Sequence, residues 1–356
     1  MRGLLCSSKG RTIVSVMHAC LLGNSNHVDL ATVPEPEVKR GEVLVRFKAG
    51  GICGTDLEKI QGGYGTGGIL GHEVSGIVEA VGQGVKQIQA GDRVVPHHHV
   101  PCYACRLCQR GDFTMCEFFK TTNFDPCGFA DRFLVPEANV SRGAVIALPR
   151  ELSFEEGALL EPTACCIRAL RTARTLPNES VLVVGLGPTG LTQLQILRHM
   201  RLSSIVGSDT IKVRREMGKR LGASLVLDPT EYDVPSEVNQ HHPGGVDLAV
   251  VATGNPRALG QAILSVRKGG RVLLFGGPAR GSSIDLDVSS LFARQLSILT
   301  SYSCVESDIQ EASRLASTRA IDLPSLVTHR FSIENSVEAL QFALNSKDAV
   351  KTMITT

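Results

Sequence analysis

The sequence predicts an α/β protein with two domains, one rich in short β-strands and one built on a doubly wound parallel sheet. The chain has 356 residues, which is more than one hydrophobic core usually serves. Short β runs separated by Gly and Pro turns fill residues 17–150. From about residue 151, apolar strands alternate with helical segments, which is the rhythm of βαβ units.

The β-rich part is predicted from four short apolar runs. Residues 17–22, 43–47, 75–81 and 93–95 carry the β-branched and aliphatic side chains that strands favour. Residues 1–16 lack both the continuous apolar stretch and the small-residue cleavage site of a secretory signal. We expect them to form a loose N-terminal extension.

The second part opens with a helix start. Ser153 is a good N-cap, and Glu155 and Glu156 follow it in the first turn. Strands are expected at 180–184, 205–208, 246–251 and 271–275, with helices at 191–200, 213–221 and 258–266. The chain after about residue 300 leaves this alternation, and we expect it to return to the first domain.

Composition excludes several classes of partner. The net charge is only +2 and the basic residues are dispersed, so neither nucleic acid nor a membrane is expected as a partner. No apolar run approaches the roughly 20 residues of a membrane span. The 11 cysteines are an odd number on a chain without a signal, which predicts reduced thiols, metal ligands and a cytoplasmic location.

A glycine-rich turn indicates a dinucleotide site. The pattern G-x-G-x-x-G follows an apolar strand and opens a helix, and its residues are Gly185, Leu186, Gly187, Pro188, Thr189 and Gly190. Gly185 permits the tight turn, Gly187 lets a pyrophosphate approach the backbone, and Gly190 lets helix and strand pack closely. The helix N-terminus then faces the phosphates. The alternative is a glycine turn that binds nothing.

Asp209 extends this prediction to the choice of cofactor. It ends the next strand, where a carboxylate accepts hydrogen bonds from the ribose hydroxyls of NAD and repels the 2′-phosphate of NADP. Arg214 follows closely and weakens the preference for NAD. Thr253 and Gly276 are further candidates for contact with the cofactor.

Four cysteines within fifteen positions are the sharpest signal in the chain, and they are Cys102, Cys105, Cys108 and Cys116. Four thiolates close a tetrahedral zinc shell and leave no open position, so such a site holds a loop in place. An iron–sulfur cluster is the alternative and has no other support in the sequence.

A second set of donors predicts an open, catalytic zinc site. Cys53, His72, Glu73 and Glu161 offer a thiolate, an imidazole and one or two carboxylates, and a water completes such a shell. An alcohol must lose its proton before hydride can leave carbon, and Zn²⁺ lowers the pKa of a bound oxygen.

Three nearby residues have expected supporting roles. The Thr55 hydroxyl can pass the proton outward, and Asp56 can accept a hydrogen bond from His72 and orient it. His98 belongs to a run of three histidines, and we expect it to form a polar wall of the substrate pocket rather than a third metal site.

These residues together resemble the zinc-containing medium-chain alcohol dehydrogenase family over about residues 17–356. Residues 71–85 match its zinc signature, G-H-E-x2-G-x5-G-x2-V, and the four cysteines match its structural zinc loop. Residues 185–190 and Asp209 match its NAD site. The resemblance implies a GroES-like catalytic domain with a Rossmann domain inserted before its last segment.

The family fold implies a domain division. We expect residues 17–158 and 297–356 to form the GroES-like domain, and residues 159–296 to form the Rossmann domain. The resemblance also implies two zinc ions per chain, one catalytic and one structural, with NAD as the cofactor and NADP disfavoured. It implies a homodimer or homotetramer, with Leu286–Thr300 at the contact.

Within the family, the chain is similar to the polyol branch. Glu161 stands where classical members place a third ligand, a Cys, and in the polyol branch Glu73 can also coordinate, so both remain candidates. Glu58 replaces a His that ends the proton relay in many members. Either Glu58 takes the proton, or the relay runs from Thr55 to the cofactor ribose and water.

Polar groups near the metal favour a polyhydroxylated substrate. His98 falls near the apolar wall of members that oxidise simple alcohols, with Phe118 nearby in sequence. A small polyol, cyclitol or aminocyclitol is therefore expected, since unpaired buried polar groups are costly. The alternatives are simple alcohols or aldehydes, threonine-type substrates, a zinc-free reductase, or a non-catalytic nucleotide-binding zinc protein. The zinc content of the protein separates these alternatives: two zinc ions per chain indicate a dehydrogenase, one indicates a structural site alone, and none indicates the reductase.

Overall fold

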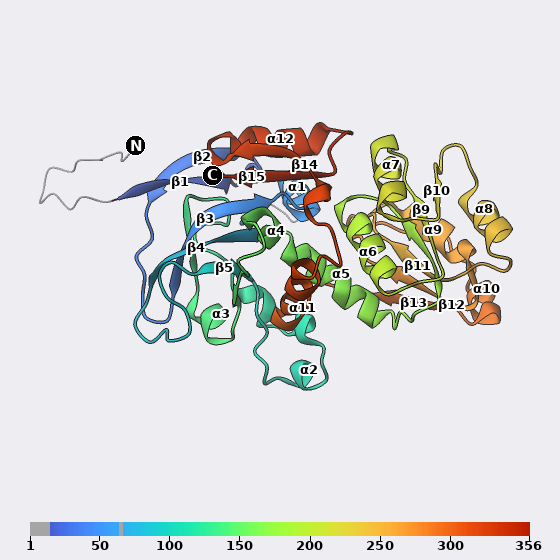
Figure 1. Cartoon of the computed structure of the whole chain (residues 1–356), viewed down its shortest axis with the longest axis horizontal. Coiled ribbons are helices and arrows are strands. Elements are labelled where there is room, and N and C mark those ends of the chain that lie inside the picture. Colours follow the sequence, from blue (N-terminus) through green and yellow to red (C-terminus); the bar gives the residue numbers. More distant parts are fainter. Residues whose placement is uncertain (1–14, 64–66) are drawn as a thin grey trace, which may run out of the picture. The chain divides into compact units, whose positions relative to one another are not determined.

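A computed structural model describes residues 15–63 and 67–356 (Figure 1). The chain divides into two compact units. The first contains the described residues up to Glu161 together with residues 305–313 and 327–356, and the second contains residues 162–304 and 314–326. Of the expected N-terminal extension, residues 1–14 lie outside the described residues, and strand β1 begins at Val16.

Antiparallel pairing dominates the first unit. Its strands are β1 (Val16–Leu22), β2 (Val28–Pro34), β3 (Val43–Gly51), β4 (Glu73–Val81), β5 (Arg93–Pro96), β6 (Arg132–Val135), β7 (Val145–Ala147), β14 (Val327–Ser332) and β15 (Lys351–Thr355). Strands β1 and β2 form a two-stranded ribbon, and the main sheet has the order β14-β15-β3-β4-β5-β7, with β6 also paired to β3. The last strand, β15, therefore lies against the early strand β3.

Short helices connect the strands of the first unit, and one longer helix covers its C-terminal strands. The helices are α1 (Gly54–Ile60), α2 (Arg106–Gln109), η1 (Phe113–Met115), η2 (Phe119–Thr121), α3 (Glu137–Ser141), α4 (Phe154–Ala158), η4 (Ile333–Asn335) and α12 (Ser336–Asn345). Helix α12 packs against β14 and β15. The start of α4 is the predicted capping box, in which Ser153 Oγ accepts from Glu156 N at 3.1 Å.

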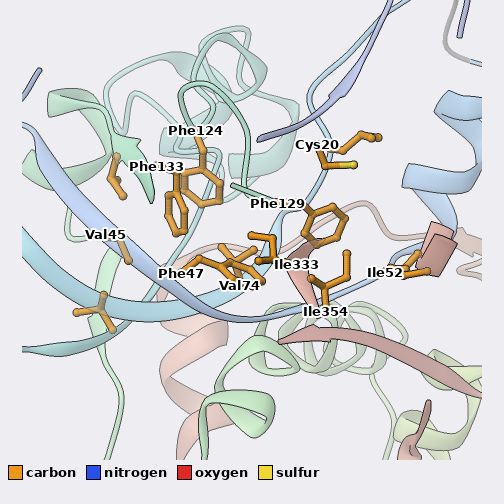
Figure 2. Packing of buried hydrophobic residues seen from close by; sticks show 14 of the residues in the cluster. Cys20, Val45, Phe47, Ile52, Val74, Phe124, Phe129, Phe133, Ile333 and Ile354 are labelled. Carbon is orange, nitrogen blue, oxygen red and sulfur yellow. The ribbon is translucent and has the colours of Figure 1, made fainter. Parts of the chain in front are cut away.

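Aromatic side chains fill the core of the first unit (Figure 2). The rings of Phe124 and Phe133 lie 4.9 Å apart, and Phe47 and Phe129 are fully buried beside them. Ile354 from β15 joins the same cluster, so the C-terminal segment contributes to the core that the N-terminal strands build. At roughly 1.5–3 kcal/mol for each fully buried side chain, this packing is a major source of stability.

The second unit is built on a six-stranded parallel sheet. Its strands are β8 (Ser180–Val184), β9 (Ser204–Ser208), β10 (Leu225–Leu227), β11 (Val246–Val251), β12 (Val266–Leu274) and β13 (Ser297–Thr300). They lie in the order β10-β9-β8-β11-β12-β13, and all neighbours pair parallel. This is the doubly wound order, with its switch point between β8 and β11. The two-part α/β prediction is confirmed.

Helices flank the parallel sheet and follow from local sequence signals. They are α6 (Pro188–His199), α7 (Lys212–Leu221), α8 (Val234–His241), α9 (Pro256–Ser265), α10 (Val288–Arg294) and η3 (Pro324–Leu326), while α5 (Leu160–Thr172) and α11 (Glu306–Ser317) each contain a boundary between the units. All five residues of β8 are buried, as a central parallel strand requires. Gly222, with φ +111°, ends α7 in the left-handed conformation.

The sheet runs past the boundary that we expected. Strand β13 pairs with β12, so residues 297–300 extend the parallel sheet although we placed them in the GroES-like domain. The alternation of strands and helices thus ends later than we expected. The sequence did not reveal this extension because α10 and β13 are short and poorly buried, so they carry no strong apolar pattern. No helix in the described part of the chain is long and apolar enough to cross a membrane.

Candidate active site and cofactor site

Three predicted metal ligands come together in the first unit. Cys53 is the N-cap of α1, His72 precedes β4, and Glu73 is the first residue of β4. One ligand atom from each lies within 4.8 Å of the other two. A thiolate, an imidazole and a carboxylate that converge in this way fit an open zinc site.

Asp56 connects two of these ligands. Its fully buried carboxylate accepts from the backbone N–H of Cys53 and of Gly71, at 3.1 Å each, and its Oδ1 lies 3.6 Å from His72 Nδ1. Burial lowers the pKa of His72, but the charges of Asp56 and Cys53 outweigh this and raise that pKa well above its ordinary value. Asp56 is therefore placed to orient His72.

Lys351 is a residue of this site that sequence reasoning missed. Its Nζ lies 2.5 Å from Glu73 Oε2 and donates to the Ile52 carbonyl at 2.9 Å, and only 3% of its surface is exposed. A Cβ on Gly51 would fall 2.2 Å from Glu73 Oε2, so a glycine is needed beside the pair. A lysine that opens a β run far along the chain gives no local signal of such a role.

Glu161 stands apart from the three-residue group. Its carboxylate lies within 4.8 Å of a His97 ring nitrogen, and the group of Cys53, His72 and Glu73 does not include it. Burial raises the pKa of Glu73, and the charge of Glu161 adds to that effect while Lys351 opposes it. The structure thus places one carboxylate with the thiolate and the imidazole, and holds the second close enough to interact electrostatically.

The two candidates for the proton relay lie on α1. Thr55 is partly buried at the second position of the helix, and Glu58 is exposed one turn later. Partial burial raises the pKa of the Glu58 carboxyl. Neither side chain belongs to the ligand group, so the relay stays a prediction.

His98 lies directly against His72, one of the predicted metal ligands. Its ring centroid is 4.9 Å from that of His72 and 4.0 Å from that of His99, and the residue is only 8% exposed. Among the described residues its buried Nδ1 has no hydrogen-bond partner. Burial and the neighbouring histidines lower the pKa of His98 well below its ordinary value, so the ring is neutral at pH 7.

Phe118 lies beside the four-cysteine loop, and its place at the substrate pocket stays a prediction. It packs against the cluster that contains Cys108 and Cys116, and the Arg142 guanidinium lies over its ring. The aromatic neighbours of the histidine run are Phe119, 5.4 Å from His99, and Phe124, 6.2 Å from His98. Adjacency in sequence did not indicate which ring would turn toward the histidines.

The four cysteines of the loop form a second donor group, with ligand atoms all within 4.8 Å. Three Sγ–Sγ distances, from Cys105 to Cys108, from Cys105 to Cys116 and from Cys102 to Cys108, are 3.6, 3.7 and 3.9 Å. A tetrahedron with Zn–S bonds of about 2.3 Å has sulfur–sulfur edges of about 3.8 Å. The loop therefore fits a closed zinc site.

Backbone N–H groups support the thiolate form in this loop. Ala104 N and Cys105 N point at Cys102 Sγ from 3.4 and 3.3 Å. These hydrogen bonds lower the pKa of Cys102 to about 6. A thiolate is the form that binds metal, so the backbone prepares the loop for zinc.

In the second unit, the glycine turn follows the central strand β8. Gly185 has φ +92°, and a Cβ on Gly190 would fall 1.9 Å from the Gly185 carbonyl oxygen, so both positions require glycine. Gly187 is the N-cap of α6, and Pro188 and Thr189 are its first two residues. Beside Gly187 the nearest atom, an Arg214 nitrogen, is 3.8 Å from an ideal Cβ, which leaves room for a phosphate.

Asp209 follows β9 and holds the glycine turn. Its Oδ2 accepts from Leu186 N at 2.7 Å and its Oδ1 from Ile211 N at 2.8 Å. An Arg214 nitrogen lies 4.0 Å from Oδ2, whereas Arg215 pairs with Asp228 at 2.7 Å. A carboxylate has lone pairs left for ribose hydroxyls after these bonds.

Thr253 and Gly276 face each other at the carboxyl ends of β11 and β12. A Cβ on Gly276 would fall 2.5 Å from the backbone of Thr253, and a Cβ on Gly185 would fall 3.1 Å from the Thr253 side chain. The three residues therefore line one edge at the switch point of the sheet. In doubly wound sheets this edge binds the ligand.

Comparison with known proteins finds relatives over most of the chain. The family model described as alcohol dehydrogenase GroES-like domain matches residues 39–146, and the one described as zinc-binding dehydrogenase matches residues 188–318. A sorbitol dehydrogenase from Bacillus subtilis is 30% identical over 356 residues, covering 96% of this chain and 98% of that protein. An L-threonine 3-dehydrogenase from Pyrococcus abyssi is 33% identical over 315 residues, covering 85% and 88%.

Solved structures agree over nearly the whole chain. A zinc-binding dehydrogenase from Sinorhizobium meliloti bound to NADP has a TM-score of 0.87 at 26% identity, covering 96% of this chain and 100% of that one. A 2R,3R-butanediol dehydrogenase from B. subtilis has a TM-score of 0.85 at 26% identity, covering 96% and 99%. The protein is an enzyme that uses zinc and a nicotinamide cofactor. It belongs to the zinc-containing medium-chain alcohol dehydrogenase family.

Proposed function

We propose that the enzyme oxidises a secondary alcohol of a small polyhydroxylated compound, a polyol, cyclitol or aminocyclitol, and transfers the hydride to NAD. The observation that carries this proposal is His98. Its buried Nδ1 has no partner among the described residues, and its ring lies 4.9 Å from the ring of His72. A substrate that offers a second hydroxyl beside the reacting one would satisfy this nitrogen, whereas a simple alcohol would leave it unpaired.

The side chains around the metal site have distinct proposed roles. Zinc bound by Cys53, His72 and a carboxylate would lower the pKa of the substrate hydroxyl. Glu73 and Glu161 are the two candidates for that carboxylate. Thr55 lies two residues after Cys53 and would pass the released proton outward, and Asp56 keeps His72 in place.

NAD is the proposed cofactor because of Asp209. Its carboxylate would accept hydrogen bonds from the adenosine ribose and repel a 2′-phosphate. Arg214, 4.0 Å from that carboxylate, reduces the repulsion, so some activity with NADP is compatible with the site. Gly185, Gly187 and the first turn of α6 would hold the pyrophosphate.

We further propose a homodimer or homotetramer with its contact at 286–300. Phe292 is 89% and Val288 70% exposed on α10, and all four residues of the edge strand β13 are at least partly exposed. Apolar side chains beside an open sheet edge suit a second copy of the chain. A cytoplasmic location is proposed because no disulfide joins cysteines in the described residues.

A spectrophotometric screen tests the proposal. Reduction of NAD would be followed over polyols, cyclitols, aminocyclitols, threonine and simple alcohols, and repeated with NADP, on protein whose zinc content has been measured. We expect two zinc ions per chain and turnover with at least one polyhydroxylated compound. Turnover with threonine or simple alcohols alone would overturn the substrate class, and zinc-free active protein would overturn the site.

A further inference from the structure

A chain of contacts in the first unit starts at the half-exposed Tyr103 of the four-cysteine loop and leads to the buried histidine run. The Tyr103 hydroxyl donates to Glu306 Oε2, and Glu306 Oε1 lies 3.7 Å from His97 Nδ1. Glu306 is 6% exposed and His97 is fully buried. Tyr103 and His97, six residues apart in the sequence, therefore meet at the carboxylate of the distant residue Glu306.

Tyr103 holds an unusual backbone conformation. It lies between the cysteines at 102 and 105 with φ +59°, a region that glycine occupies easily and a bulky side chain does not. Its ring packs on Phe113, with centroids 5.5 Å apart, and its hydroxyl reaches Glu306. A strained residue persists where its surroundings hold it, and strain of this kind gathers at functional sites.

The contacts continue from His97 into the active site. The His97 ring meets the His98 ring edge-on at 5.2 Å and 88°, and His98 lies against His72. A His97 nitrogen also lies within 4.8 Å of the Glu161 carboxylate. The His97 ring thus contacts His98, a wall of the proposed substrate pocket, and lies near Glu161, a candidate metal ligand.

Anchoring of α11 does not account for Glu306. Helix α11 begins at Glu306, and the Asp308 carboxylate already accepts from Val305 N at 3.0 Å just before that start. The Glu306 carboxylate is directed instead at Tyr103 and His97. A buried carboxylate needs such partners, because leaving it without them is costly.

We propose that Tyr103 and Glu306 are positioning residues, through which the four-cysteine loop fixes His97 and thereby the orientation of His98 and Glu161. The loop then has a role in substrate binding and turnover besides its role in stability. This inference goes beyond the proposed function and rests on it only for the enzymatic readout.

The test is a double-mutant cycle with Tyr103→Phe and Glu306→Leu. Tyr103→Phe keeps the ring on Phe113 and removes only the hydroxyl, and Glu306→Gln is the conservative variant. Gln109→Ala is the matched control, because Gln109 donates to the Ala104 carbonyl within the same loop at 3.3 Å. Zinc content, melting temperature, kcat and KM would be measured for each protein with the best polyol of the wild-type screen.

We expect Tyr103→Phe and Glu306→Leu each to lower kcat/KM about tenfold while zinc content stays at the wild-type value and each protein remains folded at the assay temperature. The double variant should lose no more than Glu306→Leu alone, since both act through one path. Glu306→Gln should recover part of the loss, and Gln109→Ala should change nothing.

Several results would overturn the inference. One is an unchanged kcat/KM in Tyr103→Phe, and another is a fall in kcat/KM that is explained by zinc release or unfolding. The third is a double variant whose fall in kcat/KM equals the product of the two single falls. If Glu306→Leu does not fold, Tyr103→Phe alone decides. Failure of the wild-type protein to use any polyol would count against the proposed function instead, and the cycle would then be run with whichever alcohol is turned over.

Discussion

Lys351 Nζ lies 2.5 Å from Glu73 Oε2, and both side chains are almost fully buried. The pair joins the last strand of the first unit to the residue that follows His72. Burial disfavours each charge alone, so each group depends on the other or, for Glu73, on a bound cation.

Lys351→Met should destabilise the protein strongly. The substitution leaves a buried carboxylate without its cation, which costs about 3–5 kcal/mol in buried pairs. Zinc can compensate that charge, so the fall in melting temperature should be larger without zinc than with it. The double variant Lys351→Met, Glu73→Gln should recover most of the loss. Lys48→Met, which removes a surface hydrogen bond to Thr356, is the control, and equal losses in both variants would contradict the assignment.

Asp56→Asn should weaken the catalytic zinc site and leave the loop site intact. One backbone N–H, of Cys53 or Gly71, would then face an amide N–H instead of a carboxylate oxygen. Loss of such a support lowers metal affinity about 10–100-fold. After dialysis, metal analysis should find one zinc per chain, and an activity assay should find no turnover. Two retained zinc ions would show that Asp56 does not hold the ligands.

His98→Phe should change the choice of substrate. The ring keeps its place beside His72 but loses its nitrogen atoms. We expect kcat/KM for the best polyol to fall about 100-fold and that for a simple secondary alcohol to be unchanged or higher. Kinetics with both substrates, compared with wild type, measure the difference. A proportional fall for both would mean that His98 only supports the fold.

Gly276→Val should raise the KM for NAD about tenfold. Its Cβ would collide with the Thr253 backbone at 2.5 Å, and overpacking of this kind costs about 1–3 kcal/mol. Gly277→Ala is a matched control, because no atom lies within 4 Å of its ideal Cβ. Initial rates against NAD concentration separate the two variants. If they behave alike, the edge formed by Thr253 and Gly276 does not contact the cofactor.

Asp247 should contribute to stability in a pH-dependent way. It accepts from Ser180 N and Oγ at 2.8 Å and from Arg267 Nε at 2.7 Å. Burial raises its pKa, but these partners outweigh burial and lower it from the ordinary value of 3.8. The stabilisation is therefore complete above pH 3.8 and is lost as the pH falls through the lowered value.

Urea unfolding of Asp247→Asn checks this expectation. The variant should be about 1–2 kcal/mol less stable than wild type at pH 7, and the difference should shrink as the pH falls below 4. A deficit that stays constant into acid would assign the effect to packing.

The sequence was sufficient for the elements that repeat a strong local pattern. The strand at 246–251 has the predicted bounds, and Ser153 caps its helix as expected. Strand β13 was assigned to the other domain because its four residues are mostly exposed and give no core signal. Pairing with β12, which places it in the parallel sheet, is a long-range contact that no local window contains.

The donor residues could be predicted because zinc restricts both residue type and spacing. Cys53, His72 and Glu73 meet as expected, whereas Lys351, almost 300 residues from Cys53, had no sequence neighbour to reveal it. The same applies to Glu306, which reaches the histidine run from α11. Supporting partners such as these are fixed by tertiary folding, so a motif does not contain them.

The position of β15 in the sheet has a consequence for biosynthesis. This strand pairs with β3, yet it leaves the ribosome only after the entire parallel-sheet unit has been translated. During synthesis the N-terminal strands therefore lack their final partner strand until the parallel-sheet unit has been made. Over the same period the Glu73 carboxylate lacks the lysine with which it pairs. A chain terminated before β15 would lack both the strand that pairs with β3 and the lysine that pairs with Glu73.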